Sequence, residues 1–376
     1  MQFRDLVKQY NILKPEIDKA MIETAASGGY IMGKAVKELE TELAQYVGVK
    51  HCITCANGTD ALTLALKVWG VSQGDAVFVP DFTFFASAEV VSLEGATPVF
   101  VDIQEDTFNI CPKHLEQQIE KTLKEGKLIP KVIITVDLFG LPADYFAVKE
   151  VADKYNLFIL EDSAQGFGGQ IGDRMACSFG DIATTSFFPA KPLGCYGDGG
   201  AVFTDNDEWA TILDSLRVHG KGSFKYDNVR IGVNSRLDTL QAAILRPKFK
   251  AFKEYEVSDI NKAAASYTKK LKGIVKTPII PEGYTSSWAQ YTIVLKDQEQ
   301  RDGLQAYLKE QSIPTMVYYP KPMHKQTAYK ELAYPKGTCP VTEKLIQTVL
   351  SLPLHPYIME EEINLVCEKI KDFMKS

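Results

Sequence analysis

Lys191 lies in a glycine-rich stretch, SFFPAKPLGCYGDGGA, that spans residues 186–201. This setting suits three uses of a lysine. A solvated loop cation needs no partner. A phosphate-binding lysine of the P-loop kind needs the order G-x-x-x-x-G-K-[ST], which this stretch lacks. A Schiff-base lysine needs a partly desolvated amine, because burial lowers its pKa and makes it a nucleophile and a base near neutral pH.

A second stretch, ANGTDAL at residues 56–62, follows a strand-like run and opens a helix. Gly58 lets the backbone approach a ligand closely, and Thr59 adds a hydroxyl beside unpaired N–H groups. These features predict an anion site at a helix N-terminus. The same residue types also cap helices that bind no ligand, so the stretch alone leaves both interpretations open.

Two further stretches carry charged and amide groups. LFILEDSAQG, residues 157–166, is an apolar run that ends in two acids, the second being Asp162. An acid in that place either caps the next turn or faces a cation. GVNSRLDTLQAA, residues 232–243, places Asn234 and Arg236 just before a long helical pattern, as a cap and surface charge or as ligand contacts.

Taken together these residue types match one cofactor, pyridoxal phosphate. It needs a lysine for its aldehyde, an anion site for its phosphate, a carboxylate that keeps its ring nitrogen protonated, and a flat surface against its ring. The stretch DFTFFASA, residues 81–88, supplies an aromatic ring. In chain order, the candidates are Gly58, Thr59, Phe84, Asp162, Ser186 and Lys191.

The elements that must position these residues follow an α/β pattern. From about residue 50 to 205, short β-rich apolar runs alternate with helical stretches. The runs are HCITCA, DAVFVP, TPVFVDI, KVIITVDLFG, LFILEDSAQ, IATTSFFP and GAVFTD. Such runs predict a mostly parallel central sheet with helices on both faces. Ligands of open α/β sheets bind at the carboxyl ends of the strands, where the candidates lie.

The rest of the chain predicts helices at 207–219 and from about 236 to 272, followed by a smaller α/β unit. That unit has expected strands near 287–296 and 314–319, and expected helices near 299–311, 341–350 and 359–374. We therefore divide the 376 residues into an N-terminal arm (1–15), a large cofactor-binding domain (16–250) and a small C-terminal domain (251–376).

Composition excludes several classes of protein. A net charge of -6 argues against nucleic acid as a partner, and no apolar run approaches the length of a membrane span. The seven scattered cysteines favour a reducing cytoplasm. Cys52 and Cys55 have C-x-x-C spacing, but positions three apart in a strand point to opposite faces, so we expect neither redox nor metal chemistry. No metal site is predicted.

The chain resembles the DegT-type sugar-nucleotide aminotransferases, a branch of the fold type I pyridoxal-phosphate enzymes. The resemblance runs nearly end to end. It lies in FRDLVKQY, GGYIMGKAVKELE, ANGTDAL, EDSAQGFGG, SFFPAKPLGCYGDGGA, GVNSRLDTLQAAIL and SLPLHPY. It implies that Lys191 carries the cofactor, that Asp162 pairs with the ring nitrogen, and that Gln165 lies near the ring hydroxyl. Phe84 would cover the ring, and Gly58, Thr59 and Ser186 would hold the phosphate.

The resemblance also implies partners. Asn234 would reach the phosphate from a second subunit, so the active unit would be a homodimer with shared sites. L-Glutamate would donate the amine to a keto-sugar nucleotide. The resemblance is greatest to enzymes that aminate C3 of UDP-2-acetamido-2-deoxy-3-keto-glucuronic acid for bacterial surface polysaccharide, such as the O-antigen of lipopolysaccharide. Arg236 is our candidate for the sugar carboxylate, and the other candidate contacts are Tyr30, Tyr318, Tyr319, His324 and Lys325.

Three alternatives remain at this point. The nearest is amination at C4 of a UDP- or dTDP-linked 4-keto-6-deoxy sugar. A non-catalytic sensor of the cofactor or of a sugar nucleotide is disfavoured because Lys191 and Asp162 are both present. A nicotinamide dehydrogenase is disfavoured because no G-x-G-x-x-G turn follows the first strand.

Overall fold

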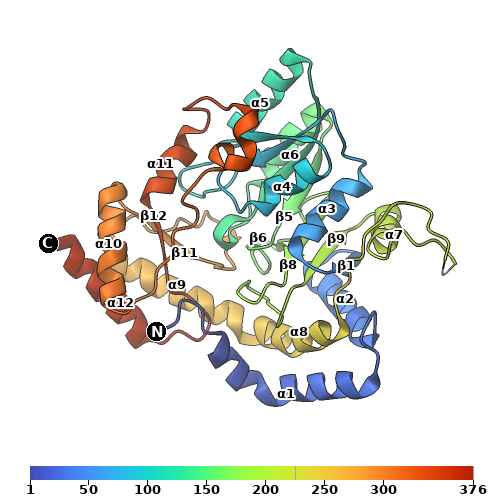
Figure 1. Ribbon diagram of the computed structural model, residues 1–376. Coiled ribbons are helices and arrows are strands. Elements are labelled where there is room, and N and C mark those ends of the chain that lie inside the picture. The colour runs from blue at the N-terminus through green and yellow to red at the C-terminus, as the bar shows by residue number, and fades with distance from the viewer. Residues whose placement is uncertain (225, 376) are drawn as a thin grey trace.

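The computed structural model describes residues 1–224 and 226–375. Its centre is a seven-stranded sheet (Figure 1). Across the sheet the strands are β1 (His51–Cys55), β9 (Gly200–Thr204), β8 (Ile182–Ser186), β5 (Phe158–Asp162), β4 (Ile129–Val136), β2 (Asp75–Pro80) and β3 (Thr97–Val101). From β8 to β3 all neighbours pair in parallel, and only β9 runs antiparallel to both of its neighbours. The predicted mostly parallel sheet is confirmed.

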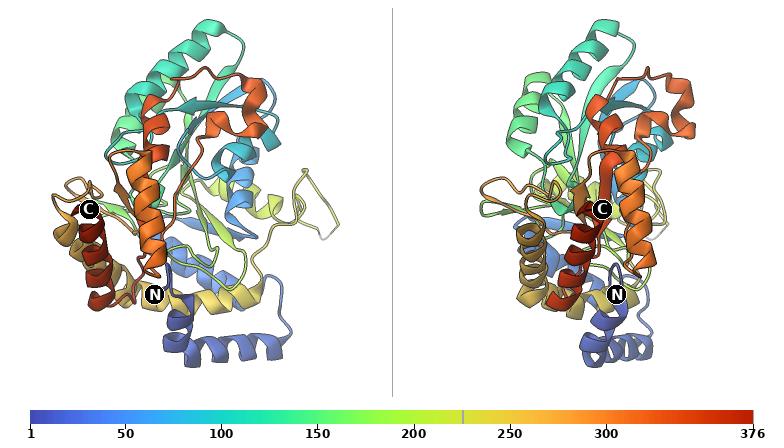
Figure 2. Two further views of the ribbon diagram at one scale, coloured as in Figure 1. Left: turned by 60° about the vertical axis from the view of Figure 1, so that its left-hand side comes forward. Right: turned by 90° about the vertical axis from the view of Figure 1, so that its left-hand side faces the viewer.

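Helices cover both faces of this sheet (Figures 1 and 2). One face packs against α3 (Gly58–Val68), α4 (Ala86–Leu93) and α7 (Asp207–Leu216). The other packs against α2 (Lys34–Val47), α5 (Pro112–Glu125), α6 (Tyr145–Tyr155) and α8 (Thr239–Ala251). Cys52 and Cys55 belong to opposite cores, as the strand periodicity predicts, and both are free and buried.

The predicted long helical stretch is present. It consists of α8, a π-helical turn η2 (Phe252–Glu256) and α9 (Val257–Leu271). The first helix, α1 (Leu6–Ser27), runs along α8 (Figures 1 and 2). Short elements complete this part of the fold: η1 (Leu138–Gly140) and a small sheet of β6 (Gln170–Ile171), β7 (Arg174–Met175) and β10 (Tyr284–Thr285).

The C-terminal part has its own core, formed by α9, α10 (Gln298–Glu310), α12 (Glu360–Lys375) and an antiparallel pair of strands. The strands are β11 (Tyr291–Val294) and β12 (Val349–Leu352). The remaining elements are η3 (Met323–Lys325), η4 (Thr327–Leu332) and α11 (Pro340–Thr348). Among the described residues, no helix is long and apolar enough to cross a membrane.

Two expectations for this part are wrong. The stretch 314–319 forms only one bridge, between Met316 and Ser351, because the prolines at 314 and 320 limit pairing and the chain then turns toward the large sheet. The predicted helix 341–350 ends at Thr348, and Val349 begins the strand that pairs with β11. The run VLSL alternates into the apolar core, and this packing overrides continuation of the helix.

The predicted domain limits fall inside helices. The limit at 15/16 lies within α1, and the limit at 250/251 lies within α8. The chain therefore passes between its parts along continuous helix, without a flexible linker at either point. The division into arm, large domain and small domain stays a prediction.

Candidate active site

A cavity of about 880 Å³ opens at the carboxyl ends of the parallel strands β2, β5 and β8. Six separate stretches of chain line it: the start of α3, the β2–α4 loop, the ends of β5 and β8, the Lys191 loop and residues 317–320. The cavity brings together these predicted residues: Gly58, Thr59, Phe84, Asp162, Gln165, Ser186, Lys191, Tyr318 and Tyr319.

One corner of the cavity is the N-terminus of α3. The Asn57 side chain accepts a hydrogen bond from Asp60 N (2.8 Å), which caps one of the free N–H groups of the first turn and leaves the others for a ligand. A Cβ atom at Gly58 would lie 2.8 Å from Ser186 Cβ, so only glycine lets α3 approach β8 this closely. The resulting corner combines helix N–H groups with the Ser186 and Thr59 hydroxyls, which suits a phosphate.

Asp162 ends β5 and is 5% exposed. Its carboxylate accepts hydrogen bonds from Ser87 Oγ (2.7 Å) and Ala164 N (3.2 Å). Burial raises its pKa, while Ser87, the Ala164 N–H and the charge of Lys191 oppose that rise. The carboxylate has neutral hydrogen-bond donors and no direct ion pair among the described residues. It is therefore a buried acid that a cationic ligand group would stabilise.

Lys191 follows β8 in a tight loop. Its N–H donates to Phe188 O (2.9 Å), and a Cβ at Gly194 would lie 2.4 Å from Pro189 O, so the glycine is needed for the loop to fold back on itself. Burial lowers the pKa of the Lys191 amine, Asp162 raises it and Arg4 lowers it. A neutral amine is a nucleophile and a base, which is the third of the three uses that the sequence left open.

Aromatic rings and an amide line the remaining walls. Phe84 is 54% exposed and its ring centroid is 6.3 Å from that of Tyr319. Gln165 Nε2 donates to Tyr319 Oη (2.9 Å), and its Oε1 accepts from Phe139 N (2.7 Å). The exposed Phe84 ring has a free face for a flat ligand, whereas Gln165 joins the end of β5 to the 317–320 segment.

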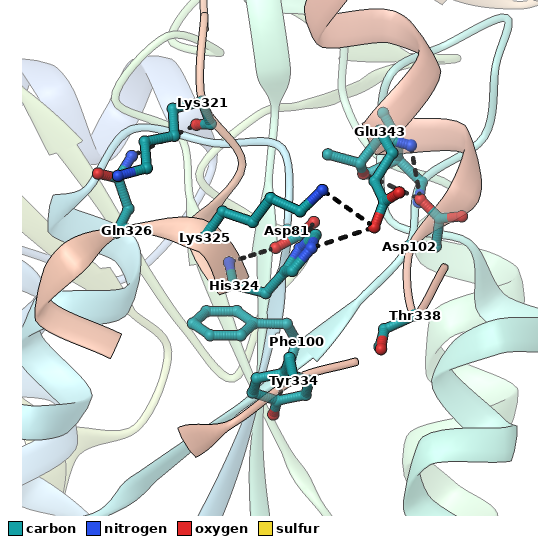
Figure 3. A network of polar contacts seen from close by, with 12 residues as sticks. Asp81, Phe100, Asp102, Lys321, His324, Lys325, Gln326, Tyr334, Thr338 and Glu343 are labelled. Atoms are coloured by element: carbon teal, nitrogen blue, oxygen red, sulfur yellow. Dashed lines mark hydrogen bonds and ion pairs between the residues drawn. The ribbon is translucent and has the colours of Figure 1, made fainter. Parts of the chain in front are cut away.

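The structure does not place His324 in the cavity, and the predicted sugar contact is therefore wrong. Its side chain is fully buried in η3, where Nδ1 lies 2.6 Å from Asp81 Oδ2 (Figure 3). The backbone N–H of His324 also donates to Asp81 Oδ1 (2.8 Å). On the other side, Nε2 lies 3.2 Å from Glu343 Oε1. Both ring nitrogens thus face carboxylates, and these contacts fasten η3 to the loop after β2.

Cys339 Sγ lies near the same pair, so that Asp81, His324 and Cys339 form a buried group of metal-ligand type. Two ligands on one tetrahedral zinc ion are separated by about 3.3 Å. The 2.6 Å separation of His324 and Asp81 is shorter and corresponds to a hydrogen bond. Burial, with Asp81 as a neighbour, raises the Cys339 pKa, so that the thiol keeps its proton. The group is best described as a structural clamp.

Four other predicted contacts lie outside the cavity. Tyr30 is 56% exposed and donates to Ala25 O (3.0 Å). Asn234 is exposed, Arg236 is half-buried and Lys325 pairs with Glu343 (3.5 Å). Within one subunit, none of these four lines the described cavity. The roles of Tyr30, Asn234 and Arg236 stay predictions that depend on a second subunit.

Sequence reasoning missed some cavity residues, of which Ser87 matters most because it donates to Asp162. It lies three residues after Phe84, in the stretch already singled out, and helix geometry there would have directed it to the same side. Other missed polar residues are Thr83, Thr184, Thr185, Asp198 and Gln290. They had no signal in the sequence, because serines and threonines at strand ends are common.

Comparison with known proteins agrees with this geometry. The model of the DegT/DnrJ/EryC1/StrS aminotransferase family matches residues 11–371. A UDP-2-acetamido-2-deoxy-3-oxo-D-glucuronate aminotransferase of Pseudomonas aeruginosa is 44% identical over 98% of both chains. A family aminotransferase from Brucella abortus has a TM-score of 0.97 at 48% identity and full coverage of both chains. The PLP form of a putative sugar aminotransferase from Streptococcus pneumoniae has a TM-score of 0.89 at 27% identity, covering 96% of each chain.

Proposed function

The chain belongs to the DegT/DnrJ/EryC1/StrS aminotransferase family, and we propose that Lys191 and Asp162 are the working amine and acid of a pyridoxal-phosphate-dependent sugar-nucleotide aminotransferase. One observation carries the assignment. Two groups separated by 29 positions in the chain, an amine whose pKa is lowered and an acid whose pKa is raised, line one cavity beside a helix N-terminus and an exposed aromatic ring.

The cavity fits the cofactor in each of its parts. The corner formed by Gly58, Thr59 and Ser186 is open because residue 58 has no side chain, and it offers N–H and hydroxyl donors to a phosphate. Asp162 is a buried acid without a cationic partner, which a protonated ring nitrogen would supply. When bound, the cofactor supplies an electron sink for the charge that develops on the carbon losing a proton.

The residues of this chain then have separate tasks. Lys191 Nζ, made neutral by burial, accepts the proton from the reacting carbon and returns it to a neighbouring carbon as general base and then acid. Asp162 remains ionised and stabilises positive charge without carrying the proton. Gln165 and Tyr319, hydrogen-bonded to each other at 2.9 Å, keep the end of β5 and the 317–320 wall in fixed relation.

For substrates we propose L-glutamate as donor and UDP-2-acetamido-2-deoxy-3-keto-glucuronic acid as acceptor. The 44% identical relative acts on that uronic acid. A diphosphate and a carboxylate need cationic and hydrogen-bonding partners. Tyr318 lines the cavity, and Arg236 and Tyr30 would complete the sugar site from the second subunit of a homodimer, together with Asn234 at the phosphate. Amination at C4 of a 4-keto-6-deoxy sugar is the alternative that an assay must exclude.

The test is a panel of keto-sugar nucleotides, with and without a C6 carboxylate, assayed with glutamate by release of 2-oxoglutarate. We expect the 3-keto uronic acid to be aminated fastest, and amination confined to 4-keto-6-deoxy sugars would refute the substrate assignment. Arg236→Ala should slow the uronic acid by about 100-fold, the loss of a charge-assisted bidentate contact, and leave the matched 3-keto-glucose compound almost unaffected. Equal losses on both compounds would show that Arg236 does not bind the carboxylate.

The shared site has a test of its own. Mixed dimers of a Lys191→Ala subunit and an Asn234→Ala subunit carry both changes in one site and neither in the other, if Asn234 acts across the interface. Activity should then return on mixing two inactive proteins. If Asn234 acts in its own subunit, every mixed site is defective and mixing restores nothing.

A further inference from the structure

The residues before α1 reach the active site from outside the cofactor domain. The first residues run beside the segment that leads into α12 (Figures 1 and 2). Phe3 O accepts from Leu354 N (3.3 Å), and the Phe3 ring packs edge-on against Tyr318 at 6.3 Å between centroids. The residue after Arg4, Asp5, caps α1 by accepting from Lys8 N (2.8 Å). Arg4 is thus fixed in the chain on both sides.

Arg4 contacts the loop of the reactive lysine. Its Nη2 donates to the carbonyl oxygen of Lys191 (2.9 Å) and lies 3.4 Å from that of Pro192. Its other terminal nitrogen, Nη1, is buried and has no hydrogen-bond partner among the described residues. A guanidinium that is held in this way, with one nitrogen unsatisfied, is costly to the fold. Its position is therefore better explained by an effect on the site than by stability.

The charges around Arg4 favour the same interpretation. Glu256 of η2 opposes the effect of burial, which lowers the pKa of Arg4 to about 10. Lys248 of α8, with a pKa lowered to about 8 by burial, and His355 after β12 also face Arg4. On the cavity side, the amine of Lys191 faces only two charged groups of the described residues, Asp162 and Arg4, and they act in opposite directions.

We propose that Arg4 is a positioning residue for Lys191, one that fixes the lysine's backbone carbonyl and keeps its amine neutral by placing a permanent positive charge behind it. The proposal rests on the proposed function, because it acts through Lys191. It gives the amino-terminal arm a role in the chemistry: the arm spans from the Tyr318 wall to the lysine loop and sets both.

The test measures the Lys191 amine itself. Holoenzyme is first converted by glutamate to its pyridoxamine phosphate form, which leaves the lysine free. Trace acetylation with acetic anhydride, which attacks only neutral amines, is then followed at Lys191 by peptide mass spectrometry between about pH 6 and pH 10. Arg4→Met removes charge and hydrogen bond, Arg4→Gln removes only the charge, and Arg4→Lys keeps both. Lys8→Met is the matched control, because Lys8 is a cation of the same arm that binds Tyr357 O instead.

We expect Arg4→Met and Arg4→Gln to shift the labelling midpoint of Lys191 to higher pH and to slow labelling at pH 7 at least about threefold. Arg4→Lys and Lys8→Met should keep the midpoint of the unchanged protein. An unchanged midpoint in Arg4→Gln, in protein whose circular dichroism is that of the unchanged protein, would overturn the proposal. Borohydride trapping of the cofactor on Lys191 in the unchanged protein separates the two hypotheses: its absence refutes the role of Lys191 itself.

Discussion

Glu161 and Asp162 are neighbours on one strand and have opposite tasks. Asp162 faces the side of the sheet covered by α3 and α4, where it borders the cavity and contacts Ser87. Glu161 faces the other side and accepts from Cys177, Phe179 and Gly180 N–H groups at 2.5, 2.7 and 2.9 Å. Ser163 Oγ also donates to Glu161 (2.9 Å). The first acid is kept available for a ligand, and the second is consumed by the fold.

The difference shows what a buried carboxylate needs. Glu161 holds loop 177–180 against the sheet with backbone N–H groups, which lower its pKa against the effect of burial. Beyond Ser163 lies Asp137, whose pKa is raised well above its usual range by burial and then by Glu161. Asp162 has fewer donors and an open side. Two acids of the same kind therefore separate into a structural group and a functional group by the face of the strand.

The largest expected effect comes from Lys191→Ala, which removes the amine from the cavity side alone. Amino transfer should fall by about 10⁴-fold, because the proton then has no carrier, while urea unfolding stays nearly unchanged. The control is Lys131→Met at the opposite edge of the sheet, where Lys131 pairs with Asp75 at 2.8 Å. It should cost about 1 kcal/mol of stability and keep the activity. Activity retained in Lys191→Ala would refute the site.

Exchanging the two acids for their amides tests the comparison directly. Asp162→Asn should lower kcat about 10²- to 10³-fold with little change in stability, because a charge that stabilises the reaction is lost. Glu161→Gln should lower the free energy of unfolding by about 2–4 kcal/mol, since an amide cannot accept from four donors, and leave kcat nearly intact. Steady-state rates and urea midpoints of both variants are compared. The reverse pattern would mean that the faces are wrongly assigned.

The pH dependence of stability tests the structural side. Asp137 has a folded-state pKa above its unfolded value of about 3.9, so its protonated form is favoured in the fold. Its contribution is complete below about pH 4 and is lost as the pH rises toward the folded pKa. Asp137→Asn, which cannot ionise, should lack this fall. The stability difference between the unchanged protein and the variant should shrink with rising pH, as urea midpoints would show, and a constant difference would contradict it.

The smallest effects are expected from the two serines that serve these acids. Ser87→Ala removes the 2.7 Å hydrogen bond that lowers the pKa of Asp162, and kcat should fall about fivefold. Ser163→Ala removes the hydroxyl between Asp137 and Glu161, and unfolding should become about 1–2 kcal/mol easier at unchanged kcat. Rates and urea midpoints of the pair are measured together. If both serines affect only stability, Ser87 does not support the chemistry.

Residue type and strand periodicity determined much of this protein from the sequence alone. The alternation of apolar runs with helices predicted the parallel sheet, and the carboxyl-end rule directed Asp162, Ser186 and Lys191 to one edge. Local spacing sufficed because each of these residues ends a strand or begins a helix. Spacing also placed Cys52 and Cys55 on opposite faces.

Only the tertiary structure decided which face of each strand would hold the cavity, and therefore which of the two acids borders it. Alternation separates the two faces but does not say which helices cover each. His324 shows the same limit: its ring is buried between Asp81, 243 positions earlier, and Glu343 because the chain folds η3 onto the loop after β2. Arg4 reaches the Lys191 carbonyl across 187 positions. Such contacts depend on packing between distant segments, which no local pattern encodes.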